Sequence, residues 1–264
     1  MLKSYFGVIL YYLLPSHLSY NLLNEYDKLI IDKANFNHNN YRDDYFDPKK
    51  YQGGKSWYTN TNEKKSDYRG YQNIIDDVLK SNPKNILEVG FGSGYYTKNL
   101  IYNNSTEYYC GIDINHNFVK FMKNIFLNEK INQKISYNLI QGDISKINKE
   151  NRKFDLIIFI SSFHHIFHRK HVFEILYDIS SENVQILMIE PSNYFPRIAK
   201  VIIKGVTKYF KKKSWSNINN LSTHHFISVG EIKSYTKGKF KIIKTNFIKQ
   251  SNFAIKYFFL IKKI

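Results

Sequence analysis

The stretch "NILEVGFGSGYYTKNL", residues 85–100, is the most informative part of the chain. An apolar run that ends at Val89 is followed by glycines at alternate positions, Gly90, Gly92 and Gly94. The whole chain has only 12 glycines in 264 residues, so this spacing indicates a local requirement. Glycine adopts positive φ angles and lets a ligand approach the backbone without meeting a Cβ atom. The stretch therefore predicts a strand, a tight turn that a ligand contacts, and then a helix.

Alternating strand and helix patterns continue from this stretch to residue 191. Continuous apolar runs separated by helical patterns are typical of a parallel sheet that helices cover on both faces. Two further apolar runs near the C-terminus are separated by a short gap, which predicts an antiparallel hairpin. We therefore expect an α/β fold with a Rossmann-like, doubly wound, seven-stranded sheet, mostly parallel with an antiparallel C-terminal hairpin strand. The expected strands are 85–90, 107–114, 135–143, 154–162, 184–191, 240–250 and 252–263, and the expected helices include 95–103, 117–129, 171–181 and 229–238.

The chain divides into an N-terminal helical and loop extension, residues 1–67, and a domain, residues 68–264, with a basic cap insertion at about 192–227. The extension ends in a polar stretch, 34–67, which reads as a long loop and a candidate lid over a site. Its apolar run, Tyr5 to Leu14, is ten residues long, which is shorter than a membrane-spanning helix. A buried or interfacial helix is favoured there. A signal peptide is the minor alternative, since no small-residue cleavage site follows.

Positive charge is concentrated in the C-terminal part of the chain. The formal net charge is +17, and the residues from Pro191 onward contain 15 Lys, one Arg and a single acid, Glu231. Four lysines recur on one helical face of the segment 198–213: Lys200, Lys204, Lys208 and Lys211. A cap helix with solvated lysines is the favoured interpretation, because lysine-rich composition is also typical of AT-rich genomes. A helix lying on an anionic membrane and phosphate contacts with RNA are the alternatives.

Five features in chain order resemble the class I S-adenosylmethionine-dependent methyltransferases. The segment "EVGFGSG" is similar to that family's first motif, whereas the dinucleotide fingerprint G-x-G-x-x-G would need a glycine at Tyr95. The segments "YYCGIDI", "IQGDI" and "FDLIIFISSFHHI" resemble those that follow in the family, and the terminal hairpin resembles its antiparallel seventh strand. The resemblance covers about 68–191 and 225–264. It implies a small-molecule enzyme that transfers a methyl group from S-adenosyl-L-methionine.

The resemblance also implies roles for individual residues. The glycine turn would contact the methionine part of the cofactor, and Glu88 its ammonium group, directly or through water. Asp113 suits the ribose diol, because a carboxylate offers two acceptors and no competing donor. Ile114 would pack on the adenine, with Asp143 at its amino group and the backbone of Ile144 at a ring nitrogen. Taken singly, the glycines could form only a tight turn and Asp143 only a helix cap. The expected cofactor-binding residues are Glu88, Gly90, Gly92, Gly94, Asp113, Ile114, Asp143, Ile144 and Ser161.

Several histidines follow the strand expected at 154–162. The resemblance places His165 near the transferred methyl group, where it would act as a general base or orient the loop. Three others would share a helix face, with Glu174 after them: His164, His168 and His171. They give a metal site only as a minor alternative, because no second ligand cluster is apparent. We therefore expect no metal.

The acceptor expected from these features is oxygen or carbon of a small or lipid-linked molecule. The segment "FISSFHH" lacks the Asn or Asp, two prolines and aromatic residue of adenine-N6 methyltransferases. Residues of the insertion that could line an acceptor pocket are Tyr194, Trp215, His224 and Phe226. An RNA methyltransferase that uses the basic C-terminal third and a non-catalytic methyltransferase-like binding domain are the alternatives. Cys110 is the only cysteine, which excludes an internal disulfide and fits a cytoplasmic protein, with peripheral contact to an anionic membrane left open.

Overall fold

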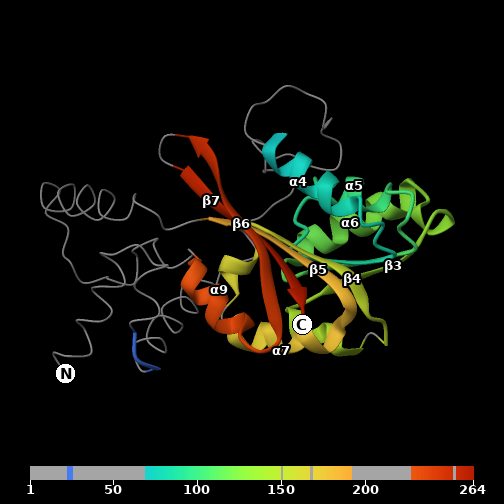
Figure 1. The fold of residues 1–264 in the computed structure, drawn as a ribbon. Coiled ribbons are helices and arrows are strands. Elements are labelled where there is room, and N and C mark those ends of the chain that lie inside the picture. The colour runs from blue at the N-terminus through green and yellow to red at the C-terminus, as the bar shows by residue number, and fades with distance from the viewer. Residues whose placement is uncertain (1–22, 26–68, 150, 167–168, 192–226, 252–253) are drawn as a thin grey trace, which may run out of the picture.

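The structure, a computed structural model, describes residues 23–25, 69–149, 151–166, 169–191, 227–251 and 254–264. Its strands are β1 (Asn85–Val89), β2 (Tyr108–Asp113), β3 (Ser136–Gln141), β4 (Phe154–Ile160), β5 (Ser180–Pro191), β6 (Phe240–Ser251) and β7 (Ala254–Lys263). They form one seven-stranded sheet in the order β3-β2-β1-β4-β5-β7-β6 (Figure 1). Strands β1 to β5 are parallel, and β7 is antiparallel to both β5 and β6. The predicted fold class and the antiparallel hairpin are confirmed.

The helices connect these strands as the sequence pattern predicts, with one clear difference in length. They are α4 (Arg69–Leu79), α5 (Thr97–Ile101), α6 (His116–Asn128), α7 (Arg169–Ile179) and α9 (Val229–Thr236), with 3-10 turns η3 (Ile131–Gln133), η4 (Ile144–Lys149) and η5 (Phe163–His165). Helix α5 is shorter than the expected 95–103, because the residues before it form the turn after β1. Helix α6 begins where the side chain of Asn115 accepts the backbone N–H groups of Asn117 and Phe118.

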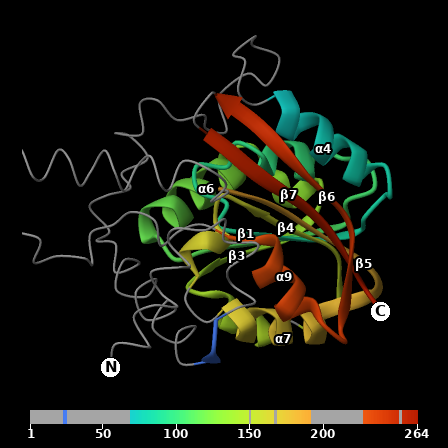
Figure 2. The same cartoon turned by 60° about the vertical axis from the view of Figure 1, so that its left-hand side comes forward.

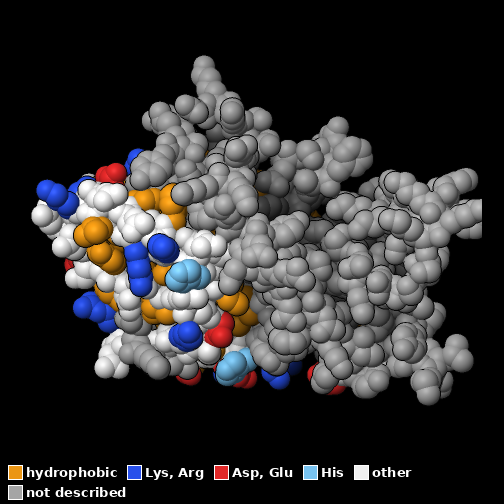
Figure 3. Space-filling model, turned by 180° about the vertical axis from the view of Figure 1, so that it is seen from behind, with side chains coloured by type: hydrophobic (Ala, Val, Ile, Leu, Met, Phe, Trp, Pro, Cys, Tyr) orange, Lys and Arg blue, Asp and Glu red, His pale blue; other side chains and the backbone are white. Residues whose placement is uncertain are grey.

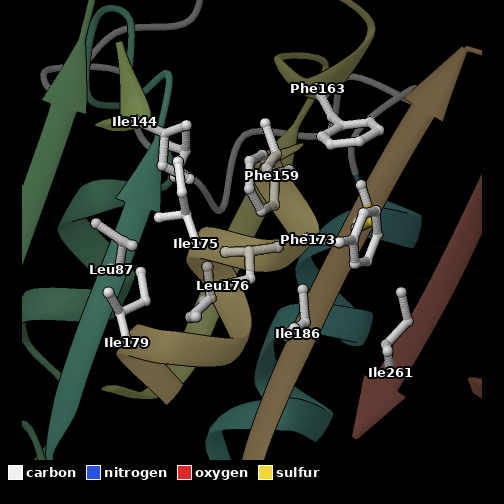
Figure 4. Packing of buried hydrophobic residues seen from close by; sticks show 14 of the residues in the cluster. Leu87, Ile144, Phe159, Phe163, Phe173, Ile175, Leu176, Ile179, Ile186 and Ile261 are labelled. Carbon is white, nitrogen blue, oxygen red and sulfur yellow. The ribbon is translucent and has the colours of Figure 1, made fainter. Parts of the chain in front are cut away.

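Two helical layers cover the sheet. Helices α4, α5 and α6 pack on one face, and α7, α9 and η4 pack on the other (Figures 1 and 2). Each face has its own core cluster: the first lies under α4, α5 and α6, and the second under α7, α9 and η4. Successive strand side chains alternate between the faces, so Ile86 belongs to the first cluster and Leu87 to the second. Figure 4 shows Phe173, Ile175, Leu176 and Ile179 of α7 packed against strand residues of the second cluster.

The N-terminal extension reaches the core at one described residue. Leu23 is buried and belongs to the core cluster on the α7 and α9 face of the sheet. Residues 1–22, 26–67 and 192–226, the last of which include the predicted four-lysine face, lie outside the described residues. Within the described ranges, no helix has the length and apolar character needed to cross a membrane.

The strand order fixes where a ligand can bind. The chain runs outward from β1 to β2 and β3, and then crosses back to β4 and β5 on the other side of β1. In open α/β sheets, ligands bind outside the carboxyl ends of the strands at such a reversal. The turns that follow β1, β2 and β4 therefore form the candidate site.

Candidate functional site

The turn after β1 has the backbone conformation that its glycines predict. Gly90, Gly92 and Gly94 have positive φ angles of 75°, 54° and 76°. Residues with a Cβ atom rarely adopt this region, so the three glycines are conformational requirements. The N–H of Gly90 donates to the carbonyl of Ile112 at 2.7 Å, which ties the turn to β2.

The space around two of these glycines differs. A Cβ atom on Gly90 would lie 2.5 Å from the Cβ atom of Ser162, in the turn after β4. A Cβ atom on Gly92 would meet no atom of the described residues within 4 Å. Gly90 therefore lets the turns after β1 and β4 touch, whereas Gly92 faces space that a ligand can enter.

Asp113 ends β2 and holds the glycine turn in place. Its side chain is buried, with Oδ2 accepting the N–H of Gly92 at 2.9 Å and Oδ1 the N–H of Asn115 at 2.8 Å. Burial raises the pKa of Asp113, and the two backbone N–H groups oppose that rise. Each carboxylate oxygen has two acceptor positions, so one position on each oxygen is left for a ligand. This geometry fits a pair of adjacent hydroxyl groups.

The residues expected near the adenine lie around the ends of β2 and β3. The side chain of Ile114 is 73% exposed, directly after Asp113. Asp143 is exposed, and its Oδ1 accepts the hydroxyl and the N–H of Ser145. The Ser145 hydroxyl is the main cause of a lowered pKa for Asp143. The side chain of Ile144 is buried in the core, so only its backbone can meet a ligand. The capping role weighed for Asp143 is thus formed, and a ligand would use its remaining lone pairs.

Glu88 forms a buried cluster with two hydroxyl groups. Its Oε2 accepts the hydroxyls of Thr97 at 2.6 Å and Tyr109 at 2.7 Å. Burial raises the pKa of Glu88 to about 7. Gly111 lies opposite Glu88 in the sheet, and a Cβ atom there would lie 2.8 Å from the Tyr109 hydroxyl. The cluster joins β1, β2 and α5 next to the glycine turn. Thr97 and Tyr109 were not expected from the sequence.

The turn after β4 is held by a carboxylate from β5. Glu190 is fully buried, and its Oε1 accepts the N–H groups of Ser162 at 3.0 Å and Phe163 at 2.8 Å. Ser161, an expected site residue, has a φ of 55° and donates its N–H to Ile189 at 2.8 Å. The only sequence signal for Glu190 is a charged residue at the end of an apolar strand, and it was missed.

The same carboxylate binds a histidine next to the expected one. Nδ1 of His164 lies 2.6 Å from Oε2 of Glu190. The rings of His164 and His165 lie 4.0 Å apart, measured between centroids, so both imidazoles stand at the turn after β4. His171 lies on α7, is exposed and pairs with Glu174 instead. His164 therefore does not share a helix face with His171, and the described ranges contain no group of three potential metal ligands.

A buried ion pair holds the turn from its other end. Arg169 is 2% exposed and donates to Glu231 Oε1 and to the carbonyl of His164, both at 2.8 Å. Its Nε also donates to the carbonyl of Ile166 at 3.1 Å. Glu231 lies in the first turn of α9, where its N–H donates to the Ser228 hydroxyl at 3.0 Å. The only acid of the basic C-terminal part is therefore internal.

Some expected residues cannot be placed. The four residues expected to line an acceptor pocket lie outside the described residues: Tyr194, Trp215, His224 and Phe226. His168 also lies outside them. The structure does bring together the glycine turn, Asp113 and the turn that carries Ser161 and His165.

The comparisons with known proteins agree with this geometry. The chain matches the methyltransferase domain family over residues 80–251, and none of the curated proteins matches it. One similar solved structure is the N-methyltransferase NodS from Bradyrhizobium japonicum WM9 in complex with S-adenosyl-L-homocysteine. It has a TM-score of 0.54, 12% identity, and coverage of 76% of this chain and 89% of that chain. A second is an S-adenosylmethionine-dependent methyltransferase from Clostridium acetobutylicum ATCC 824. Its TM-score is 0.53, with 17% identity over 74% of this chain and 92% of that chain.

A third similar structure is named for a different reaction, so the fold alone does not identify the reaction. The [4+2]-cyclase SpnF has a TM-score of 0.55 and 9% identity, over 80% of this chain and 88% of that chain. At such identities a structural likeness shows the fold alone, and one fold can host different reactions. The family match does not depend on these structures, and it covers well over half of the chain. Together with the seven-stranded sheet and the glycine turn, it shows that this protein is an enzyme of the class I S-adenosylmethionine-dependent methyltransferases.

Proposed function

We propose that the turns after β1, β2 and β4 bind S-adenosylmethionine and that the protein methylates oxygen or carbon of a small or lipid-linked acceptor. The observation that carries this proposal is the geometry of Asp113. Its buried carboxylate holds the glycine turn through Gly92 and keeps an acceptor position on each oxygen. Gly92, with open space, and Ile114, with an exposed side chain, both adjoin this carboxylate. A ribose diol with an apolar ring beside it matches these three features.

The strand order then gives a direction for the cofactor across the sheet edge. Ribose at Asp113 would lie over β2, and adenine near Ile114 and Asp143 would lie toward β3. The remaining part of the molecule would extend across the glycine turn of β1 toward the turn after β4. His165 lies in that turn, which supports its proximity to the reacting methyl group.

The chain's own residues would mainly position the reactants. The bound sulfonium supplies both the methyl group and a good leaving group. The protein has to align the acceptor with that methyl group and exclude water. A hydroxyl acceptor would also need a base, and we assign that role to His165. His165 donates its N–H to the carbonyl of Ser162 at 3.0 Å, so the turn fixes the position of its backbone.

The charge distribution supports an acceptor at an anionic lipid surface. Exposed lysines of the described C-terminal part are Lys233, Lys237, Lys241, Lys244 and Lys262. The one acid of this part, Glu231, is buried against Arg169. Lysines near an anionic bilayer each contribute about 1 kcal/mol of attraction. Figure 3 shows that Lys and Arg side chains lie among hydrophobic, acidic and His side chains over the described part of one face.

Methyl transfer to fractionated cell extract tests the proposed function. Purified protein and S-adenosylmethionine with a labelled methyl group are incubated with lipid, polar small-molecule and RNA fractions. We expect label in the lipid or small-molecule fraction. Label in RNA alone would replace the proposed acceptor class, and absence of both label and S-adenosylhomocysteine binding would contradict the proposal.

Two histidine variants test the proposed base in the same assay. His165→Ala should lower turnover by roughly 10²- to 10⁴-fold while cofactor binding is retained. His171→Ala is the matched control, because His171 is exposed on α7 and pairs with Glu174, and it should transfer methyl groups normally. A loss below tenfold for His165→Ala would leave that residue a purely structural role.

A further inference from the structure

The hydroxyl group of Ser162 is the most informative polar group that the proposed site has not used. Its oxygen is buried and has no hydrogen-bond partner among the described residues. A Cβ atom on Gly90 would lie 3.3 Å from this oxygen, so the hydroxyl lies against the glycine turn. Buried hydroxyl groups are normally hydrogen-bonded, because an unsatisfied one loses its contacts with water and gains nothing in return. An unsatisfied hydroxyl at this place points to a ligand.

We propose that Ser162 binds the amino-acid end of S-adenosylmethionine through its side-chain hydroxyl. This assignment rests on the proposed function, because it uses the direction of the cofactor across the strand ends. Asp113 ends β2, and Ser162 follows β4 on the other side of β1. A ligand with its ribose at Asp113 and its adenine toward β3 brings its third part to Ser162. That part carries an ammonium and a carboxylate group, and a hydroxyl can accept from the first or donate to the second.

The backbone around Ser162 is fixed before any ligand arrives. Its N–H donates to Oε1 of Glu190 at 3.0 Å, and its carbonyl accepts the N–H of His165 at 3.0 Å. Arg169 binds the carbonyl of His164 in the same turn. A group that is already positioned binds a ligand without the cost of ordering it. Glu190 is therefore a positioning residue for Ser162, and its own side chain acts through the backbone.

The chain contains a matched control for a buried hydroxyl without a partner. Ser181 Oγ is also buried and unpaired within the described part of the chain. Ser181 lies near the amino end of β5, at the opposite edge of the sheet from the proposed site. Replacing either serine by alanine removes the same chemical group from a similar environment. Only one of the two replacements should affect the ligand.

Calorimetric titration of wild type, Ser162→Ala and Ser181→Ala with two ligands tests the assignment. S-adenosylhomocysteine carries the amino-acid end, and methylthioadenosine lacks it. For Ser162→Ala we expect the Kd for S-adenosylhomocysteine to rise by roughly 5- to 30-fold, the range of one hydrogen bond to a charged or polar group. The Kd for methylthioadenosine should change by less than about twofold, and Ser181→Ala should leave both Kd values unchanged.

Thermal unfolding without ligand is a second measurement. A structural role for the Ser162 hydroxyl predicts a lowered Tm for Ser162→Ala, whereas the proposed ligand role does not. Loss of an unsatisfied buried hydroxyl should leave the Tm of both variants unchanged or raise it by about 2–4 °C. Ser162→Ala with wild-type affinity for S-adenosylhomocysteine would overturn the assignment while the proposed function stands. Equal losses for both ligands, or a lowered Tm, would overturn it in favour of a role in turn structure. Wild-type protein that binds neither ligand would overturn the proposed function, and the assignment with it.

Discussion

The two turns that touch at Gly90 are built in different ways. The turn after β1 is formed by glycines with positive φ, and one carboxylate 21 residues away holds it through the N–H of Gly92. The turn after β4 is held by the charged side chains of Glu190, from β5, and Arg169, from α7. Glu190 binds it from 28 residues away, and Arg169 connects it to Glu231, 62 residues further along the chain.

This difference predicts which substitutions should affect ligand binding and which should affect stability. The first turn depends on backbone conformation and keeps acceptor positions open, so changes there should mainly affect the ligand. The second turn depends on buried ionic groups, and removal of one partner leaves a buried charge without compensation. Removal of one of these charged groups should therefore mainly affect folding. The following variants test this division, starting with the largest expected effect.

Arg169→Met should lower the free energy of unfolding by about 3–5 kcal/mol, because it leaves Glu231 buried and unpaired. Urea denaturation at neutral pH measures the loss. The double variant Arg169→Met, Glu231→Leu should recover most of it, since apolar residues of similar volume often replace a buried ion pair at little cost. If the single variant were as stable as wild type, the turn after β4 would not depend on its charges.

Asp113→Ala should weaken S-adenosylhomocysteine binding by about 2–4 kcal/mol, because the two charged hydrogen bonds that we propose between Asp113 and the ribose would be lost. Calorimetric titration measures the change. Asp113→Asn keeps the shape and one acceptor, so it should show a smaller loss. The variants should still fold, with some loss of stability because the N–H groups of Gly92 and Asn115 lose their acceptor. Unchanged affinity would remove Asp113 from the site.

Glu88→Gln should stabilise the unliganded protein at pH 8 by about 2–3 kcal/mol. The pKa of Glu88 is raised from 4.5 to about 7, so the folded state binds this proton more tightly than the unfolded state. Wild-type stability should therefore be highest below pH 4.5, fall as pH rises toward 7, and change little above it. Gln cannot titrate, so the variant should lack this fall. Unfolding measured at acidic, intermediate and basic pH checks it, and parallel profiles would contradict it.

Gly92→Ala should have the smallest effect on folding, about 1–2 kcal/mol, because alanine is strained at positive φ but its Cβ meets no atom of the described residues. Gly90→Ala carries the same strain and also overlaps Ser162, so it should destabilise the protein more. Chemical denaturation of the two variants side by side measures the difference. Equal stability losses would show that the two turns do not press together at Gly90.

Sequence reasoning succeeded where the determining contacts are local. The strands follow from apolar runs, the glycine turn from its spacing, and the position of Asp113 at the end of β2 from the apolar run before it. It failed where contacts join distant segments. The sequence neighbours of Glu190 and Arg169 do not indicate that both side chains bind the turn after β4. Their hydrogen-bond partners depend on how β5 and α9 pack against that turn. His164 and His165 are neighbours of the same type, so only the three-dimensional structure identifies which one pairs with Glu190.

The burial of Leu23 has a consequence for how the protein can be divided. A boundary between residues 67 and 68 separates two stretches of different composition, but Leu23 belongs to the same core cluster as Leu87 and Phe173. A fragment that begins at residue 68 would therefore leave an unfilled hole in that core, and Leu→Ala cavities in other cores cost about 2–5 kcal/mol. The extension supplies part of the interior of the enzyme, so removing it by proteolysis would also weaken the domain that it precedes.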